Sequence, residues 1–482
     1  MQERTLITGR IGLTAITNLL VAVSTLVLLA VVTKTLSIAD YGTWALVLVT
    51  ATVVPKFATL GLPYTMVRFL AAARDKQAIR EIFYSNTFIS AAASAIVCGV
   101  LLLFTPQIAA NLFHNNSTSA LLFVLNAFLA CLDNIALNYF RSRQQVKRYT
   151  SLTFAQAYLQ LILITLFILL GYGLQGALMG LFAQQLILLV VMAMLIVQQI
   201  GFAIPKFSNA REYLSFGLPL VPGQVSSWAV ASSDRYIIGL FLGTVAVGYY
   251  SPGYSLGSNL ALLATPLVMM LPAILSKHYD EKNIEEVKTI MKYSLKYYLG
   301  VAIPCAFAVS VLSKPLLTIL TTPEIAENGY YITPFVAAAT VLVGAYEVIV
   351  LTNVLKKKTV ITGTIWVVSA LVNVGLNLIL IPRFGIIAAA LTTLAAFGCA
   401  FTLTTVYALR HFTFDLNSRF VVKSISASAA ITVFLFLLNP TRLVSVILML
   451  ALSAAIYLGI MFLLRGFTIP EAKFFYRMFR SR

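Results

Sequence analysis

The chain is poor in charge. Of its 482 residues only 10% are Asp, Glu, Lys or Arg, whereas 60% are hydrophobic, and the mean hydropathy is +0.91. A water-soluble fold of this size needs many more polar groups to cover its surface. The composition therefore excludes a soluble globular protein and indicates a polytopic membrane protein.

Histidine and cysteine are also scarce, with three and four residues. The cysteines lie inside apolar stretches and the histidines in three separate loops: Cys98, Cys131, Cys305, Cys399, His114, His278 and His411. Neither set has the close spacing of a metal site. No glycine-rich loop followed by Lys and Ser or Thr is present, which argues against ATP hydrolysis by the chain itself. We therefore expect no catalytic residues, no metal and no cofactor.

Acidic residues are few, and the cations are unevenly placed. The chain has sixteen Asp and Glu residues and thirty-four Lys and Arg residues, which gives a net charge of +18. Fourteen apolar runs long enough to span a bilayer lie between Ile11 and Leu464, the second of them at 42–66. The cations fall in every second gap between these runs, apart from Lys34, Lys314, Arg383 and Arg442 in the other gaps and Lys56 and Arg235 inside runs. Cytoplasmic loops retain cations, so the pattern predicts an even number of spans with both termini cytoplasmic. It suits the anionic inner leaflet rather than nucleic acid.

The chain also repeats itself at an offset of a little over 200 residues. The matching segments are 36–42 with 242–248, 78–82 with 286–290, and 173–177 with 385–389. This predicts an all-α polytopic membrane protein with about fourteen transmembrane helices. Two parallel six-helix bundles, related by pseudo-two-fold symmetry, would cover residues 1–205 and 206–415. Residues 416–482 would add two transmembrane helices and a basic cytoplasmic tail.

Several segments resemble one known family. They are Leu36 to Tyr41, Leu60-Gly61-Leu62-Pro63, Phe216-Gly217-Leu218-Pro219, Asp234 to Gly239, Gly248-Tyr249-Tyr250-Ser251 and, most specific, Asn373 to Ala389. Together they resemble the polysaccharide biosynthesis (Wzx-type) flippases, which share a superfamily with MATE-type multidrug antiporters and lipid II flippases. One departure is Ala388, where the family usually has glycine. The resemblance implies export of a polyprenyl-(pyro)phosphate-linked oligosaccharide from the inner to the outer leaflet of the cell membrane by alternating access, with glycan-assembly proteins as possible partners.

Ionisable side chains inside the hydrocarbon cost about 3 kcal/mol each at a helix centre, so they usually face protein or water. Cations there could bind the phosphates of such a lipid carrier. The substrate candidates are therefore Lys56 and Arg235, with Arg68 at the inner mouth. Alternatively, Arg235 reaches the outer interface and Asp234 pairs locally.

Carboxylates and amides inside the spans supply further candidates. Asp133 and Glu347 occupy equivalent spans of the two halves, and with Asp234 they could bind a proton or sodium ion that drives transport. They could equally neutralise the buried cations. Asn373 and Asn377, four residues apart, could bind sugar hydroxyls or join neighbouring helices.

Two other transport functions fit the same scaffold. A MATE-like ion-coupled exporter of drugs or cations is disfavoured, because Lys56 and Arg235 make the interior partly cationic. A lipid II flippase ranks below a flippase for other lipid-linked glycans. Lipid II flippases resemble one another through an arginine in the first span, whereas residues 11–33 of this chain contain no charge. An enzyme is disfavoured too, because the outer loops 105–119 and 314–329 are too short for a catalytic domain.

Overall fold

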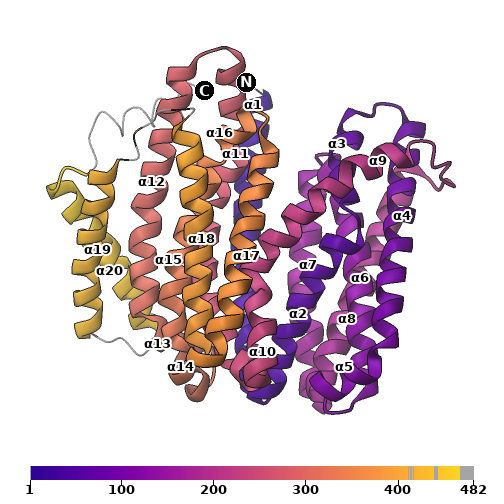
Figure 1. Ribbon diagram of the computed structural model, residues 1–482, viewed down its shortest axis with the longest axis horizontal. Coiled ribbons are helices and arrows are strands. Elements are labelled where there is room, and N and C mark those ends of the chain that lie inside the picture. The colour runs from indigo at the N-terminus through magenta and orange to yellow at the C-terminus, as the bar shows by residue number, and fades with distance from the viewer. Residues whose placement is uncertain (1, 411, 413–414, 416, 439–442, 467–482) are drawn as a thin grey trace. The chain divides into compact units, whose positions relative to one another are not determined.

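The structure is a computed structural model that describes residues 2–410, 412, 415, 417–438 and 443–466. All regular elements in these ranges are helices, which confirms the predicted all-α class (Figure 1). Helices satisfy their own backbone hydrogen bonds, and a chain surrounded by lipid has no water to do so. The basic tail, His411 and Arg442 lie outside the described residues.

The chain forms two compact units. The first unit is Ile16–Gly248. The second unit is Met1–Ala15 together with Tyr249–Arg482, so that α1 and α10 each contribute residues to both units. In the first lie α1 (Gln2–Thr35), α2 (Ile38–Ala58), α3 (Leu62–Ala72), α4 (Lys76–Leu103), α5 (Thr105–Leu112), α6 (Ser117–Ser142), α7 (Val146–Phe167), α8 (Gly173–Ile200), α9 (Ala210–Gly217) and α10 (Val221–Ser258). The units divide after Gly248, inside α10. The sequence boundaries after residues 205 and 415 stay predictions.

The second unit continues with the remaining helices. They are α11 (Thr265–Asp280), α12 (Ile284–Val311), α13 (Ser313–Leu320), α14 (Pro323–Gly329), α15 (Thr333–Ile349), α16 (Leu351–Leu355), α17 (Thr359–Phe384), α18 (Ile386–Leu409), α19 (Ser418–Leu438) and α20 (Leu443–Leu463). Helix α19 packs along α12 and α20 along α19. Buried Ser424 and Tyr457 join their hydroxyls across α19 and α20 at 2.7 Å.

The membrane spans agree with the sequence. Twelve helical segments of the described chain are long and apolar enough to cross a bilayer. The two longest, Val146–Ile200 and Ala210–Asp280, each bend at a glycine with non-helical backbone, Gly171 and Gly243. With each of these two taken as two spans, the twelve segments correspond to the fourteen predicted spans.

One predicted span boundary is wrong. The second apolar run, 42–66, does not form one helix, because α2 ends at Ala58 and α3 begins at Leu62. Gly61 between them has φ +71°, a left-handed conformation that only glycine adopts at little cost. A Cβ at Gly61 would overlap the carbonyl oxygen of Gly217, at the end of α9. Two glycines of the family-like segments therefore meet, and this contact places α3 against α9.

The sequence repeats have matching local structure. Helices α4 and α12 each contain 28 residues and start behind a side-chain cap, Asp75 or Asn283. Each is followed by an eight-residue helix, α5 or α13. Gly173 and Gly385, which open the sixth and twelfth spans, have similar backbone angles of φ +52°, ψ −135° and φ +70°, ψ −156°. The repeat is therefore visible in helix lengths and turns as well as in residue types.

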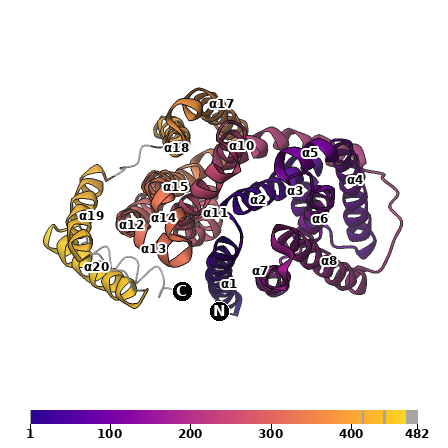
Figure 2. The ribbon, with the colours of Figure 1, turned by 90° about the horizontal axis from the view of Figure 1, so that it is seen from below.

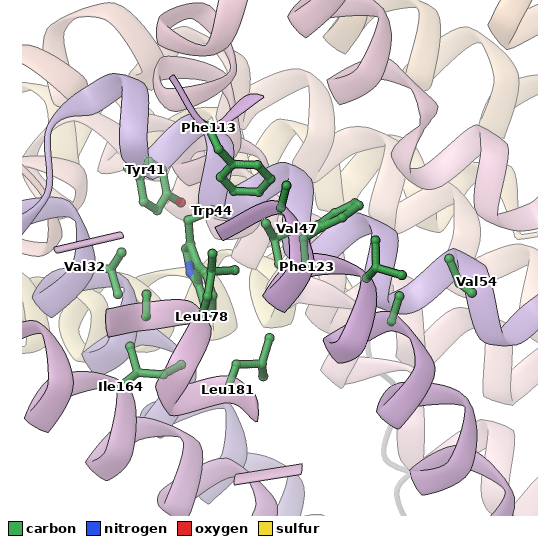
Figure 3. Packing of buried hydrophobic residues seen from close by; sticks show 14 of the residues in the cluster. Val32, Tyr41, Trp44, Val47, Val54, Phe113, Phe123, Ile164, Leu178 and Leu181 are labelled. Atoms are coloured by element: carbon green, nitrogen blue, oxygen red, sulfur yellow. The ribbon is translucent and has the colours of Figure 1, made fainter. Parts of the chain in front are cut away.

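A dense apolar core fills the end of the first unit that carries α5. Tyr41, Trp44 and Val47 of α2 face Phe113, Phe123 of α6 and Leu178 of α8 (Figure 3). In a bilayer such contacts are held by close packing rather than by exclusion of water. Small residues permit that closeness, since Gly180 of α8 lies directly against the backbone of Ile164 in α7. This core closes one end of the unit.

Candidate functional site

A cavity of about 670 Å³ lies inside the first unit. Its walls come from α1, α2, α6, α7 and α8, whose ribbons Figure 2 shows from below, with contributions from the start of α3 and from Gln224 of α10. Leu28 and Leu181 belong both to its lining and to the apolar core, so the core closes it at the α5 end. Exposed Tyr64 and Arg141 lie on the lining near the other end, where α3 and α6 meet.

Most of the lining side chains can form hydrogen bonds. The polar members are Ser24, Thr25, Thr52, Lys56, Thr59, Tyr64, Asp133, Asn134, Asn138, Arg141, Thr153, Gln156, Gln160, Gln184, Gln185 and Gln224. On α6 they recur at helical spacing from Asp133 to Arg141, so one face of this helix lines the cavity. The arrangement can bind a large polar ligand through many neutral groups and a few charges.

Three lining groups have side chains that can carry charge: Lys56, Arg141 and Asp133. Lys56 is half-buried in the last turn of α2, directly after Pro55. Asp133 is 7% exposed, and its Oδ1 has no hydrogen-bond partner among the described residues. No ion pair joins these three groups in the described chain. The three side chains are therefore available to a ligand, an ion or water.

The carboxamides are the most numerous polar groups of the lining. Asn138 donates to the backbone oxygen of Asn134 at 2.8 Å, within α6. Gln184 and Gln185 of α8 are buried, and Gln184 Nε2 and Gln185 Oε1 have no partner in the described chain. Leaving a buried polar atom unpaired costs about 1–3 kcal/mol, so such atoms in a cavity wall indicate a polar occupant.

Arg235 and Asp234 form a local pair on α10. Nη1 of Arg235 lies 3.1 Å from Oδ1 of Asp234 and donates to the carbonyl of Ala231 at 3.0 Å. Both side chains are buried, at 8% and 0% exposure, and neither lines the cavity. The local pairing considered as an alternative from the sequence is therefore present.

Arg68 lies near the cavity but not on its lining. It is exposed on α3, and its guanidinium carbon sits 4.5 Å from the ring centre of Phe216 and 5.8 Å from that of Phe69. Stacking of this kind stabilises the contact between α3 and α9.

The remaining candidates lie in the second unit. Asn373 and Asn377 of α17 are fully buried, and Nδ2 of Asn377 donates to Oδ1 of Asn373 at 3.0 Å. The hydroxyl of Thr392, on α18, donates to Oδ1 of Asn377. These bonds join two helices. Glu347 is half-buried on α15. The structure thus brings Lys56 and Asp133 to one cavity and places the other predicted residues elsewhere.

Sequence reasoning missed several lining residues. The charge pattern marks Arg141 only as one of the cations between apolar runs, and it does not single out the amides at 156, 160, 184 and 185. Their spacing was available as a signal, because Gln156 with Gln160 and Asn134 with Asn138 recur four residues apart in apolar helices. In the described residues, no three His, Cys, Asp or Glu side chains gather where they could hold a metal ion.

Comparison with known proteins decides the family. The sequence profile described as "Polysaccharide biosynthesis protein" matches residues 31–327, more than half of the chain. The chain belongs to this polysaccharide biosynthesis family. The resemblance drawn from the sequence is confirmed, although its segment from Asn373 to Ala389 lies beyond the matched range.

Two curated relatives of this family member come from Haloferax volcanii. A probable low-salt glycan biosynthesis flippase, Agl15, is 23% identical over 40% of this chain and 41% of the relative. A probable flippase, AglR, is 29% identical over 37% of each chain. The chain thus spans about two-fifths of the length of the curated relatives it matches.

Solved structures show the same fold. The lipid II flippase MurJ in an inward closed conformation superposes with a TM-score of 0.75 at 15% identity, covering 93% of this chain and 97% of MurJ. An inward-facing MATE family multidrug transporter gives a TM-score of 0.70 at 13% identity, covering 83% and 98%. The family member therefore has the MATE-like fold and is a multi-pass membrane protein.

Proposed function

We propose that the chain is a flippase that moves a polyprenyl-(pyro)phosphate-linked oligosaccharide from the inner to the outer leaflet of the cell membrane by alternating access. The cavity is the observation that carries this proposal. It combines two cations, Lys56 and Arg141, with many neutral hydrogen-bonding groups. A glycan offers hydroxyl groups to match the amides, and its phosphate linkage offers negative charge to match the cations. The family and the two flippase relatives support the same substrate class.

In this proposal the α3 end of the first unit faces the cytoplasm. Cations gather there, among them Arg141 at the end of α6 and Lys147 at the start of α7, whereas residues 105–119 at the α5 end contain no Lys or Arg. The two termini would then also be cytoplasmic. The glycan would enter from the cytoplasmic side and stop at the apolar core. Residues 1–205 and 206–415 would form the two bundles, and 416–482 an addition to them.

Asp133 is the proposed site of ion coupling. It is the lining carboxylate of the cavity, and its Oδ1 has no internal partner in the described chain. A carboxylate in a wet membrane cavity can bind a proton or a sodium ion. Asp234 is less suited to this role because Arg235 already neutralises it. Glu347 would serve as a second site in the other unit.

Reconstitution tests the proposal. Purified protein in liposomes would be given fluorescent polyprenyl diphosphate N-acetylglucosamine, lipid II or an organic cation, with leaflet transfer or uptake as the readout. We expect transfer of the first lipid above the rate in protein-free liposomes. Transport of lipid II or of the organic cation alone would instead establish one of the two competing functions.

A further inference from the structure

Four glutamines form one side of the cavity, which we call the glutamine wall. Gln156 and Gln160 lie one turn apart on α7, and Gln184 and Gln185 are neighbours on α8. The two helices are antiparallel and very close at one point, where a Cβ on Gly180 would lie 2.7 Å from Cα of Ile164. Gln160 precedes that point by one turn on α7, and Gln184 follows it by one turn on α8. The two amides therefore stand at the same depth.

The glutamine wall is not used to join helices. None of its four amides forms a hydrogen bond with another described residue, although Gln184 and Gln185 are only 1% and 5% exposed. Amides that do join segments of this protein behave differently. Gln145, for example, donates to Gln199 of α8 at 2.6 Å, away from the cavity. Buried amides without internal partners, gathered on one cavity wall, are placed for a ligand.

We propose that the glutamine wall binds uncharged sugar residues of the transported glycan through their hydroxyl and acetamido groups. This inference rests on the proposed flippase function and names the sugars that the cavity accepts. A carboxamide offers both a donor and an acceptor, which matches hydroxyl groups that both donate and accept. It carries no charge and has no preference for phosphate. The anionic linkage is left to Lys56 and Arg141.

Asp133 sets the limit of this specificity. Its carboxylate shares the cavity with the glutamine wall and accepts hydrogen bonds but donates none when ionised. No cation of the described chain forms an ion pair with it. With Asp133 ionised, a uronic acid bound at the wall would bring a second carboxylate into the same cavity, and the two like charges would repel each other. The wall therefore accepts neutral sugars and rejects acidic ones.

Equilibrium binding in detergent tests the inference without an ion gradient. Two labelled probes of equal chain length would be compared, polyprenyl diphosphate N-acetylglucosamine and polyprenyl diphosphate glucuronic acid. Wild-type protein is expected to favour the neutral probe. The double variant Gln160→Met, Gln184→Met should bind it about tenfold or more weakly, since each lost hydrogen bond reduces affinity severalfold. Gln198→Met, at an exposed position of α8 outside the cavity, is the matched control.

Asp133→Asn tests the preference for neutral sugars. This variant should bind the glucuronic acid probe more tightly than the wild type does, with an affinity closer to that for the N-acetylglucosamine probe. Unchanged binding of both probes to the glutamine double variant would overturn the role of the wall. A failure of Asp133→Asn to narrow the difference between the probes would overturn the exclusion of acidic sugars. If wild-type protein binds neither probe and flips neither in liposomes, the proposed function itself is wrong, which is a distinct outcome.

Discussion

Lys56 and Arg235 are the two cations that membrane topology does not explain, and the structure separates them. Arg235 is paired with its neighbour Asp234 and lies away from the cavity. Lys56 lies on the lining, with its charge free of any ion pair in the described chain. The sequence could single out both residues because charge in an apolar run is rare. It could not distinguish them, because pairing depends on side-chain direction within a turn of α10.

Substitution of Lys56 tests its role as a phosphate-binding group. Lys56→Gln removes the charge and keeps a polar side chain, so the fold should persist. We expect transport of polyprenyl diphosphate N-acetylglucosamine in liposomes to fall by about tenfold to a hundredfold, since a charged hydrogen bond contributes about 1.5–3 kcal/mol. Lys206→Gln, at an exposed position between α8 and α9, should transport at the wild-type rate. Equal rates for the two variants would remove Lys56 from the binding site.

Asp133→Asn tests ion coupling in the same liposomes. The amide cannot take up a proton and binds sodium weakly, so gradient-driven accumulation of polyprenyl diphosphate N-acetylglucosamine should be lost while downhill transfer continues. Comparison of rates with and without an imposed proton or sodium gradient measures this directly. Continued stimulation by a gradient in the Asp133→Asn, Glu347→Gln double variant would place the coupling site elsewhere.

Among the helices, the contact between α3 and α9 depends on the absence of side chains. Gly61 has a positive φ and faces the carbonyl of Gly217, while a Cβ on Gly217 would lie 2.7 Å from the carbonyl oxygen of Leu60. Thr65 of α3 also donates to the carbonyl of Tyr213 in α9 at 3.2 Å. Composition alone predicts these residues as parts of spans. The break at Gly61 follows from a long-range approach of two backbones, which a local pattern does not contain.

Gly61→Ala should destabilise the protein. The left-handed conformation costs a non-glycine residue about 1–2 kcal/mol, and the overlap with Gly217 adds to that. Thermal unfolding of the purified protein in detergent should show a lower midpoint. Gly99→Ala in α4 is the control, because a Cβ there meets no atom within 4 Å. Identical unfolding midpoints for the two variants would mean that the close contact between α3 and α9 at Gly61 does not contribute to the stability of the protein.

For the whole molecule, helix number and the repeat follow from sequence alone, because apolar length and charge alternation are set by the bilayer. The cavity does not, because it requires faces of five helices to converge. Asp133 on α6 and Gln184 on α8 are far apart in sequence, and their common lining becomes visible only once α6, α7 and α8 are packed. The amides could have been noted, but not their convergence.

Membrane orientation is testable with single cysteines in a variant lacking the four native ones. Thr118→Cys, at the exposed start of α6, should react with an impermeant maleimide in intact cells. Lys147→Cys, at the exposed and cation-rich start of α7, should react only after permeabilisation. The opposite labelling pattern would invert the orientation proposed for the cavity.

The start of α2 contacts the later part of α10 through two equivalent contacts that are related by the internal repeat. A Cβ on Gly42 would overlap the carbonyl oxygen of Thr244, and a Cβ on Gly248 would lie 2.5 Å from the carbonyl oxygen of Ile38. Residues 38 and 42 correspond to 244 and 248 in the internal repeat, so exchanging the two segments reproduces the same pair of contacts. Self-complementary contacts of this kind are typical of dimers with two-fold symmetry. Within one continuous chain, α2 and α10 therefore meet as two copies of a single ancestral subunit would.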